Sequence, residues 1–289
     1  MIQKQEILDI IGLPMLVYDY VKKFRLDKNE TLEGFISSID NKSDIESLSS
    51  LRNEALNHLK DNSPNGQVVE FIDDPDTDLQ VGITLSETQK RVSVVFRGSE
   101  TRSDWYYDLM ISKRKIEDNV YVHNGFYQQL HVNNNYEKIK QSIEKVLESD
   151  DKKDYEVLVT GHSLGAALAT LFGYLYSRET PRQIKIISFA SPRIGNAGFK
   201  TRFDSQENLI HYRITNNRDI ITTSPMINYK HVGINIHLTS SGKVQKYPSY
   251  NYNTWYMFSL FRCWSVADHN IDLYYERLKN CTWDFNDVE

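Results

Sequence analysis

The segment YEVLVTGHSLGAALATLF, residues 155–172, decides the fold of this chain. Residues 155–160 form a near-continuous apolar run, which is typical of a strand buried on both faces of a parallel sheet. From Leu164 to Arg178 the leucines recur at helical spacing. The pentapeptide Gly161-His162-Ser163-Leu164-Gly165 therefore joins a buried strand directly to a helix.

This pentapeptide has the G-x-S-x-G pattern of a nucleophile elbow. A serine hydroxyl is a poor nucleophile, so it must be held at a sharp turn where a base can reach it. Flanking glycines permit that turn, and the N-terminus of the next helix directs N–H groups towards an oxyanion. We predict that Ser163 is a catalytic nucleophile. The alternative is a glycine-rich turn that only packs a helix against a sheet.

Strands and helices are predicted on both sides of the pentapeptide, and their alternation implies parallel strands joined by right-handed crossovers. We expect one α/β domain, residues 1–289, with a mostly parallel central sheet flanked by helices. Residues 1–65 are a helical N-terminal extension, and residues 66–280 are the catalytic core. The predicted strands are 67–72, 79–85, 91–96, 155–160, 184–190, 209–215, 232–238 and 243–247, and the predicted helices are 13–24, 45–59, 126–148, 164–178, 194–203 and 271–278.

Composition excludes several classes of protein. Hydrophobic residues make up 40% and charged residues 25% of the 289 residues, which is ordinary for a globular protein and not for a disordered chain, collagen or coiled coil. The net charge of −5 argues against nucleic-acid binding, which needs a basic surface. Cys263 and Cys281 have no zinc-site spacing, and we expect two free buried thiols.

The N-terminal stretch predicts a helix and not a signal peptide. Glu6 and Asp9 precede its apolar core, Pro14 interrupts that core, and the start is not basic. The longest apolar cluster elsewhere, residues 255–261, is far shorter than the ~20 residues that span a bilayer. We expect no transmembrane anchor and a protein that is intracellular and soluble, or peripheral at membranes. The sequence leaves its oligomeric state open.

Several motifs together resemble the fungal-type class 3 lipase family of the α/β-hydrolases. They occur in the family's order and extend over most of the chain. The resemblance implies a serine hydrolase of lipid esters that needs no metal and no cofactor. The motifs are VVFRGS (94–99), VHNGF (122–126), GHSLGAALATLF (161–172), FASPRIGN (189–196), RITNNRD (213–219) and DH (268–269).

The catalytic base should follow the serine in the chain, because α/β-hydrolase triads run in the order Ser, Asp or Glu, His. His211 and His237 lie within predicted strands and His231 begins one, so they are read as buried structural histidines. His269 lies in a loop before the last helix and matches the histidine of the family's Asp-His pair. We predict His269 as the base and assign His162 a supporting role.

The acid that orients this imidazole is predicted to be Asp219. It follows the strand 209–215, at the sheet edge where α/β active sites gather, and it aligns with the family's catalytic aspartate. The alternative is an ordinary turn aspartate. The rival Asp204 ends a predicted helix and matches no family motif. Two departures from the family pattern are Asp272, where an aromatic residue is usual, and a single Pro225 in place of a Pro-Pro pair.

Two further features complete the predicted site. The oxyanion should receive the N–H of Leu164, which follows the nucleophile, and the resemblance assigns a second N–H to Ser99. In the family, the segment that corresponds to residues 100–111 is a lid that opens at a lipid surface, which makes Trp105 and Leu109 lid candidates. The alternative for this segment is an ordinary surface helix.

Together these features predict a triacylglycerol lipase-like serine esterase that uses an acyl-enzyme mechanism. Its partner would be a lipid ester at a lipid–water interface. One alternative keeps the same triad but acts as a phospholipase A1, a monoacylglycerol hydrolase or another esterase. The other alternative is a catalytically silent hydrolase fold that binds lipids or protein partners.

Overall fold

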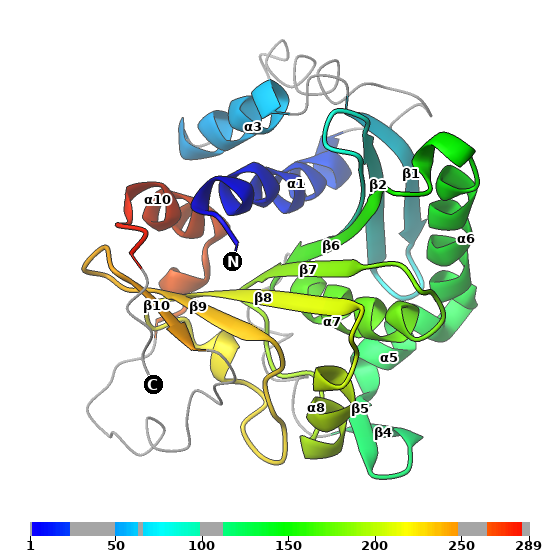
Figure 1. Cartoon of the computed structure of the whole chain (residues 1–289). Coiled ribbons are helices and arrows are strands. Elements are labelled where there is room, and N and C mark those ends of the chain that lie inside the picture. Colours follow the sequence, from blue (N-terminus) through cyan, green and yellow to red (C-terminus); the bar gives the residue numbers. More distant parts are fainter. Residues whose placement is uncertain (1, 24–49, 63–65, 99–111, 248–264, 285–289) are drawn as a thin grey trace.

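A computed structural model describes residues 2–23, 50–62, 66–98, 112–247 and 265–284, in which a large sheet lies between two layers of helices (Figure 1). The strand order is β1-β2-β3-β6-β7-β8-β9-β10. The strands from β3 to β9 pair in parallel, whereas β1, β2 and β10 pair antiparallel at the two edges. The strands are β1 (Gln67–Asp74), β2 (Leu79–Ser86), β3 (Arg91–Phe96), β6 (Glu156–His162), β7 (Ile184–Phe189), β8 (Leu209–Asn216), β9 (Ile234–Leu238) and β10 (Val244–Tyr247).

Apolar side chains of the central strands alternate between two hydrophobic cores, because successive residues of a strand point to opposite faces. Val157 and Val159 of β6 belong to one core, and Leu158 between them belongs to the other. The core around Leu158 is covered by α1 (Lys4–Lys23), α3 (Ser50–Asn62) and α10 (Ile271–Asn280). The opposite core is covered by α5 (Asn124–His131), α6 (Asn135–Leu147), α7 (Leu164–Ser177) and α8 (Ala197–Asp204).

The predicted fold class is therefore confirmed, and a strand of the sheet occurs at each predicted position. The described parts of residues 1–65 are largely helical, and α3 begins at Ser50 among the residues described there. Cys281 is a buried free thiol, while Cys263 lies outside the described residues. Within the described ranges, no helix is both long and apolar enough to cross a membrane.

The single helix predicted over 126–148 is wrong. The chain forms α5 and α6 instead, separated by a short 3₁₀ turn (Val132–Asn134). Asn133 and Asn134 both adopt left-handed backbone conformations, with φ of 53° and 57°, which asparagine tolerates better than most residues. The amide of Asn133 donates to the Asp74 carboxylate at 3.1 Å, and this contact fixes the break.

A small antiparallel hairpin, β4 (Lys113–Glu117) and β5 (Val120–His123), was not predicted. Its first strand has the sequence KRKIE, whose exposed charged residues hide any apolar alternation. The turn between the two strands places Asn119 at a φ of 61°. The hairpin precedes α5 and lies beside α8 (Figure 1).

Candidate active site

Ser163 occupies a strained turn between β6 and α7, with φ of 61° and ψ of −123°. The glycines on either side are sterically required there. A Cβ at Gly165 would lie 2.3 Å from the carbonyl oxygen of Phe96, and one at Gly161 would lie 2.5 Å from the backbone of Gly165. The N–H of Ser163 donates to the carbonyl of Phe189, on β7, at 3.0 Å. The turn therefore has the geometry of a nucleophile elbow.

The structure brings Ser163, His269 and Asp219 into one hydrogen-bonded chain, and all three are buried. The Oγ of Ser163 lies 2.7 Å from Nε2 of His269. Nδ1 of His269 lies 2.9 Å and 3.0 Å from the two carboxylate oxygens of Asp219. Because the carboxylate orients the ring through Nδ1, Nε2 presents a lone pair to the serine hydroxyl.

Two further donors hold the carboxylate of Asp219. The hydroxyl of Tyr274, on α10, donates to Oδ2 at 2.7 Å, and the N–H of Ile221 donates to Oδ1 at 3.0 Å. Burial, reinforced by the charge of Asp219, raises the pKa of Tyr274 well above its ordinary value. Tyr274 therefore stays protonated and remains a donor. This side chain was not among the predicted site residues.

Asp268, next to the predicted base, ties the loop of Asp219 to the start of α10. Its carboxylate accepts the side-chain amide of Asn217 at 2.9 Å and the N–H of Arg218 at 3.2 Å, and it pairs with Arg277 at 2.8 Å. The N–H of Ser265 also donates to the carbonyl of Arg218 at 3.0 Å. These contacts explain how residues so distant in sequence as 219 and 269 meet.

The other candidate bases are buried away from the nucleophile, as the sequence predicts. Nε2 of His211 pairs with the Ser188 hydroxyl at 2.8 Å, and Nε2 of His231 donates to the Thr222 carbonyl at 2.7 Å. Burial lowers the pKa of His211 to about 3 and that of His231 well below its ordinary value, so both imidazoles are neutral. His237 is buried too, with Nδ1 3.0 Å from the Thr215 hydroxyl.

The remaining predicted site residues fall only partly within the described ranges. Leu164 is the first residue of α7, so its N–H lies at the helix N-terminus beside Ser163. Ser99, Trp105 and Leu109 lie outside the described residues. The rival acid Asp204 ends α8 and pairs with Lys200 at 2.6 Å. In the described part of the chain, no group of three or more His, Cys, Asp or Glu side chains could hold a metal ion.

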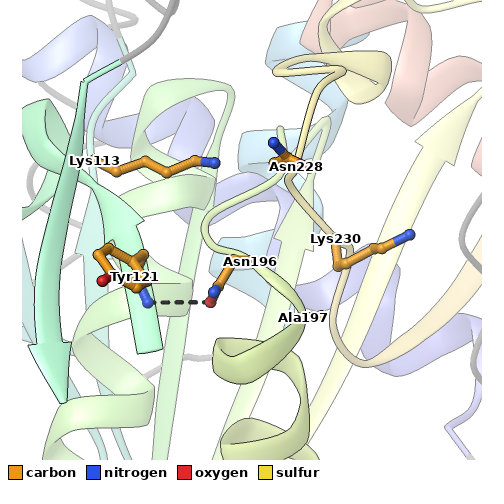
Figure 2. Close-up of a pocket in the computed structure, with 6 residues that line it drawn as sticks. All are labelled: Lys113, Tyr121, Asn196, Ala197, Asn228 and Lys230. Atoms are coloured by element: carbon orange, nitrogen blue, oxygen red, sulfur yellow. Dashed lines mark hydrogen bonds between the residues drawn. The ribbon is translucent and has the colours of Figure 1, made fainter. Parts of the chain in front are cut away.

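A surface pocket of about 420 Å³ contains none of the three triad side chains. In Figure 2 the side chain of Lys113 extends across it towards Asn228, while Lys230 lines its opposite side. The ammonium of Lys113 also lies 4.8 Å from the centre of the Tyr229 ring. The pocket is lined by Lys113, Tyr121, Asn196, Ala197, Asn228 and Lys230.

The elbow, the parallel sheet and the Ser-His-Asp arrangement together define an α/β-hydrolase. Residues 93–229 match the family model for lipase (class 3). This match, over just under half of the chain, and the similarity to proteins named as lipases confirm the resemblance seen in the motifs.

Similar proteins occur in fungi and plants. A secreted mono- and diacylglycerol lipase A of Penicillium cyclopium is 29% identical over 175 residues, which cover 59% of this chain and 55% of that protein. A phospholipase A1-II 1 of Oryza sativa subsp. indica is 28% identical over 191 residues, which cover 58% and 48%. The chain thus matches about half the length of these curated relatives.

Solved structures share the fold. The crystal structure of a lipase from Rhizopus microsporus var. chinensis superposes with a TM-score of 0.70 at 24% identity. The superposition covers 92% of this chain and 85% of that one. It therefore extends beyond the matched family segment to most of the chain, including residues on both sides of it.

Proposed function

We propose that this protein is a serine carboxylic-ester hydrolase that acts on lipid esters. The observation that carries the proposal is the chain of contacts from Ser163 Oγ to His269 Nε2 at 2.7 Å and from His269 Nδ1 to Asp219 at 2.9 Å. Such an arrangement, at an elbow before a helix N-terminus, is suited to acyl transfer. The names of the family and of the relatives support a lipid ester as substrate.

In the first half of the reaction, Ser163 Oγ attacks the ester carbonyl while His269 Nε2 takes the hydroxyl proton. Asp219 stabilises the imidazolium that forms. The negative charge that develops on the carbonyl oxygen would be received by the N–H of Leu164 and, as the family resemblance suggests, by that of Ser99. His269 then returns its proton to the departing alcohol, which leaves an acyl-serine.

In the second half, His269 removes a proton from water, and the hydroxide attacks the acyl-serine carbonyl. The tetrahedral intermediate collapses to free fatty acid, and the proton on His269 restores the Ser163 hydroxyl. Apart from the substrate and this water, every group in the two half-reactions belongs to the chain itself.

The same proposal has the protein act on its substrate at a lipid–water interface. Ile227 is 78% exposed and Met226 37% exposed on the loop that follows Asp219, and Val266, three residues before His269, is 53% exposed. Large apolar side chains exposed on the loops that carry the triad favour contact with lipid.

Ile227→Ser should weaken co-sedimentation with phosphatidylcholine vesicles. The matched control is Ile210→Ser, because Ile210 is 38% exposed near the opposite end of β8.

The test of the hydrolytic function is fatty-acid release from a diacylglycerol emulsion and from a soluble short-chain ester. The wild-type chain should release acid from both, and Ser163→Ala should release none above the rate without enzyme. A correctly folded wild-type protein that hydrolyses neither ester would overturn the proposal and favour the catalytically silent alternative.

A phospholipid is the second candidate substrate, favoured by the pocket in Figure 2 and by the similarity to phospholipase A1-II 1. The ammonium of Lys113 would pair with a headgroup phosphate. Lys113→Gln should then lower the hydrolysis of phosphatidylglycerol relative to that of diacylglycerol by about tenfold, the factor for roughly 1.4 kcal/mol. An unchanged ratio of the two rates would exclude the contact between Lys113 and the headgroup, and failure of the wild-type chain to hydrolyse phosphatidylglycerol would remove the candidate.

A further inference from the structure

A second chain of contacts reaches the base from the N-terminal helix. The hydroxyl of Tyr18, on α1, lies 3.1 Å from Nδ1 of His162. Nε2 of the same imidazole lies 2.9 Å from the backbone carbonyl oxygen of His269. The sequence assigns His162 only a supporting role and does not single out Tyr18, yet together they join α1 to the residue that carries the base.

The partners of His162 fix which nitrogen carries its proton. A carbonyl oxygen is only an acceptor, so Nε2 must bear the hydrogen that it donates to His269. In a neutral imidazole Nδ1 is then an acceptor, and the Tyr18 hydroxyl is the group that donates to it. The opposite tautomer would set the Nε2 lone pair against the lone pairs of the carbonyl. The carbonyl of His269 therefore sets the tautomer, and the Tyr18 hydroxyl supports it by donating to the Nδ1 lone pair.

Ring packing makes this chain of contacts stiff. The rings of His162 and His269 lie with their centroids 4.7 Å apart, and the Tyr18 ring meets His162 edge-on at 5.9 Å. Tyr18 also packs closely on Gly98, where a Cβ would lie 1.9 Å from its hydroxyl oxygen. The same Cβ position lies 2.6 Å from the carbonyl oxygen of His162, so a shift of Tyr18 would disturb both the side chain and the backbone contacts of His162.

The helix that carries Tyr18 is itself firmly seated. Leu16 and Val17 on α1 are buried in the core beneath α3 and α10, together with Phe189 of β7. Figure 1 shows α1 lying along the sheet beside α10, which follows His269 in the chain. Helix α1 is thus placed to hold a tyrosine hydroxyl at a fixed distance from the base.

We propose that Tyr18 is a positioning residue for His269 and that α1 therefore belongs to the catalytic apparatus. This inference rests on the proposed hydrolase function. Tyr18 acts through His162, whose N–H holds the backbone of residue 269 so that its imidazole stays within 2.7 Å of Ser163 Oγ. Small displacements of a base lower the rate of the chemical step more than they lower substrate binding.

The kinetic test is Tyr18→Phe, which keeps the ring and removes only the hydroxyl. We expect kcat on a soluble short-chain ester to fall roughly 10- to 100-fold, with KM changed less than about threefold. The matched control is Tyr155→Phe at the other end of β6, which should leave both constants unchanged. Wild-type kcat in Tyr18→Phe would overturn the inference while leaving the hydrolase proposal intact.

A spectroscopic test compares the same two proteins without measuring activity. The ¹⁵N chemical shifts of the His162 ring in the wild-type protein at neutral pH should show a neutral imidazole protonated at Nε2. The Tyr18→Phe protein should keep the hydrogen on Nε2, but its Nδ1 resonance should move downfield, as expected for a ring nitrogen that has lost its hydrogen-bond donor. An Nδ1 shift equal to that of the wild type would show that the hydroxyl does not donate to His162. A wild-type His162 that is protonated at Nδ1 would contradict the inference. Absence of ester hydrolysis by the wild type would instead contradict the hydrolase proposal.

Discussion

Asp219→Asn preserves the shape of the acid but replaces one acceptor oxygen with a donor NH₂ group. The carboxylate now accepts the Ile221 N–H on Oδ1 and the Tyr274 hydroxyl on Oδ2, and His269 Nδ1 lies within 3.0 Å of both oxygens. Asparagine has only one acceptor oxygen. If that oxygen remains on Ile221, the NH₂ group faces Nδ1, which must then give up its hydrogen.

The consequence is the wrong tautomer of His269. Its remaining hydrogen moves to Nε2, which lies 2.7 Å from Ser163 Oγ and can no longer accept the serine proton. In serine-protease triads this substitution lowers kcat by about 10⁴. At about 1.36 kcal/mol per decade this corresponds to roughly 5.4 kcal/mol of lost transition-state stabilisation. We expect a similar loss here, because Asp219 is only 1% exposed and water cannot easily replace it.

The assay is kcat on p-nitrophenyl butyrate, with a thermal unfolding scan to show that the variant is folded. Asp204→Asn is the matched control, since Asp204 lies at the end of α8, where it pairs with Lys200. The control should keep the wild-type kcat. If folded Asp219→Asn turns over within tenfold of the wild type, the acid is another residue and the reasoning is refuted.

Three more predictions concern stability. Gly165→Ala should lower the free energy of unfolding by about 3 kcal/mol or more, because the new Cβ would lie 2.3 Å from the carbonyl oxygen of Phe96. Urea denaturation measures this, and a midpoint equal to that of the wild type would contradict it. Tyr274→Phe should lower the free energy of unfolding by about 2–3 kcal/mol, because it removes a hydrogen bond to the charged Asp219. A loss below about 0.5 kcal/mol in the same assay would be inconsistent with that bond. Burial lowers the pKa of His211 to about 3 from an ordinary 6.5, so the unfolded chain binds one more proton between these values and stability falls as the pH is lowered through them. His211→Gln should flatten urea-derived stability against pH there by up to about 1.4 kcal/mol per unit, and an unaltered slope would exclude this contribution.

Much of the fold could be predicted because its signals are local. The apolar run before Ser163 and the leucine spacing after it indicate a strand and a helix, and the glycines between them indicate a sharp turn. The break between α5 and α6 was missed because left-handed Asn133 and Asn134 read as ordinary helix positions inside a periodic pattern. The hairpin β4–β5 was missed because its first strand is mostly charged.

Site residues could be predicted from the sequence where a neighbouring strand, helix or motif marks them. They could not be predicted where only the packing of the fold brings them to the site. Ser163 and Asp219 each follow a predicted strand, so topology directs both to the same sheet edge. His269 was predicted from its place in the loop before the last helix and from its match to the family's Asp-His pair. Tyr274 has a weaker signal, since it lies on the buried face of the last helix. Tyr18 has none, because its partner His162 is brought near only by the packing of α1 on the sheet.

The central claim is that the hydroxyl of Ser163 is activated by His269, and covalent labelling tests it most directly. The folded protein should react with a fluorophosphonate, and peptide mapping by mass spectrometry should place a single stoichiometric adduct on Ser163. The adduct should be absent from Ser163→Ala and should form far more slowly in His269→Ala. An unlabelled wild-type protein, or an adduct on another residue, would contradict the account.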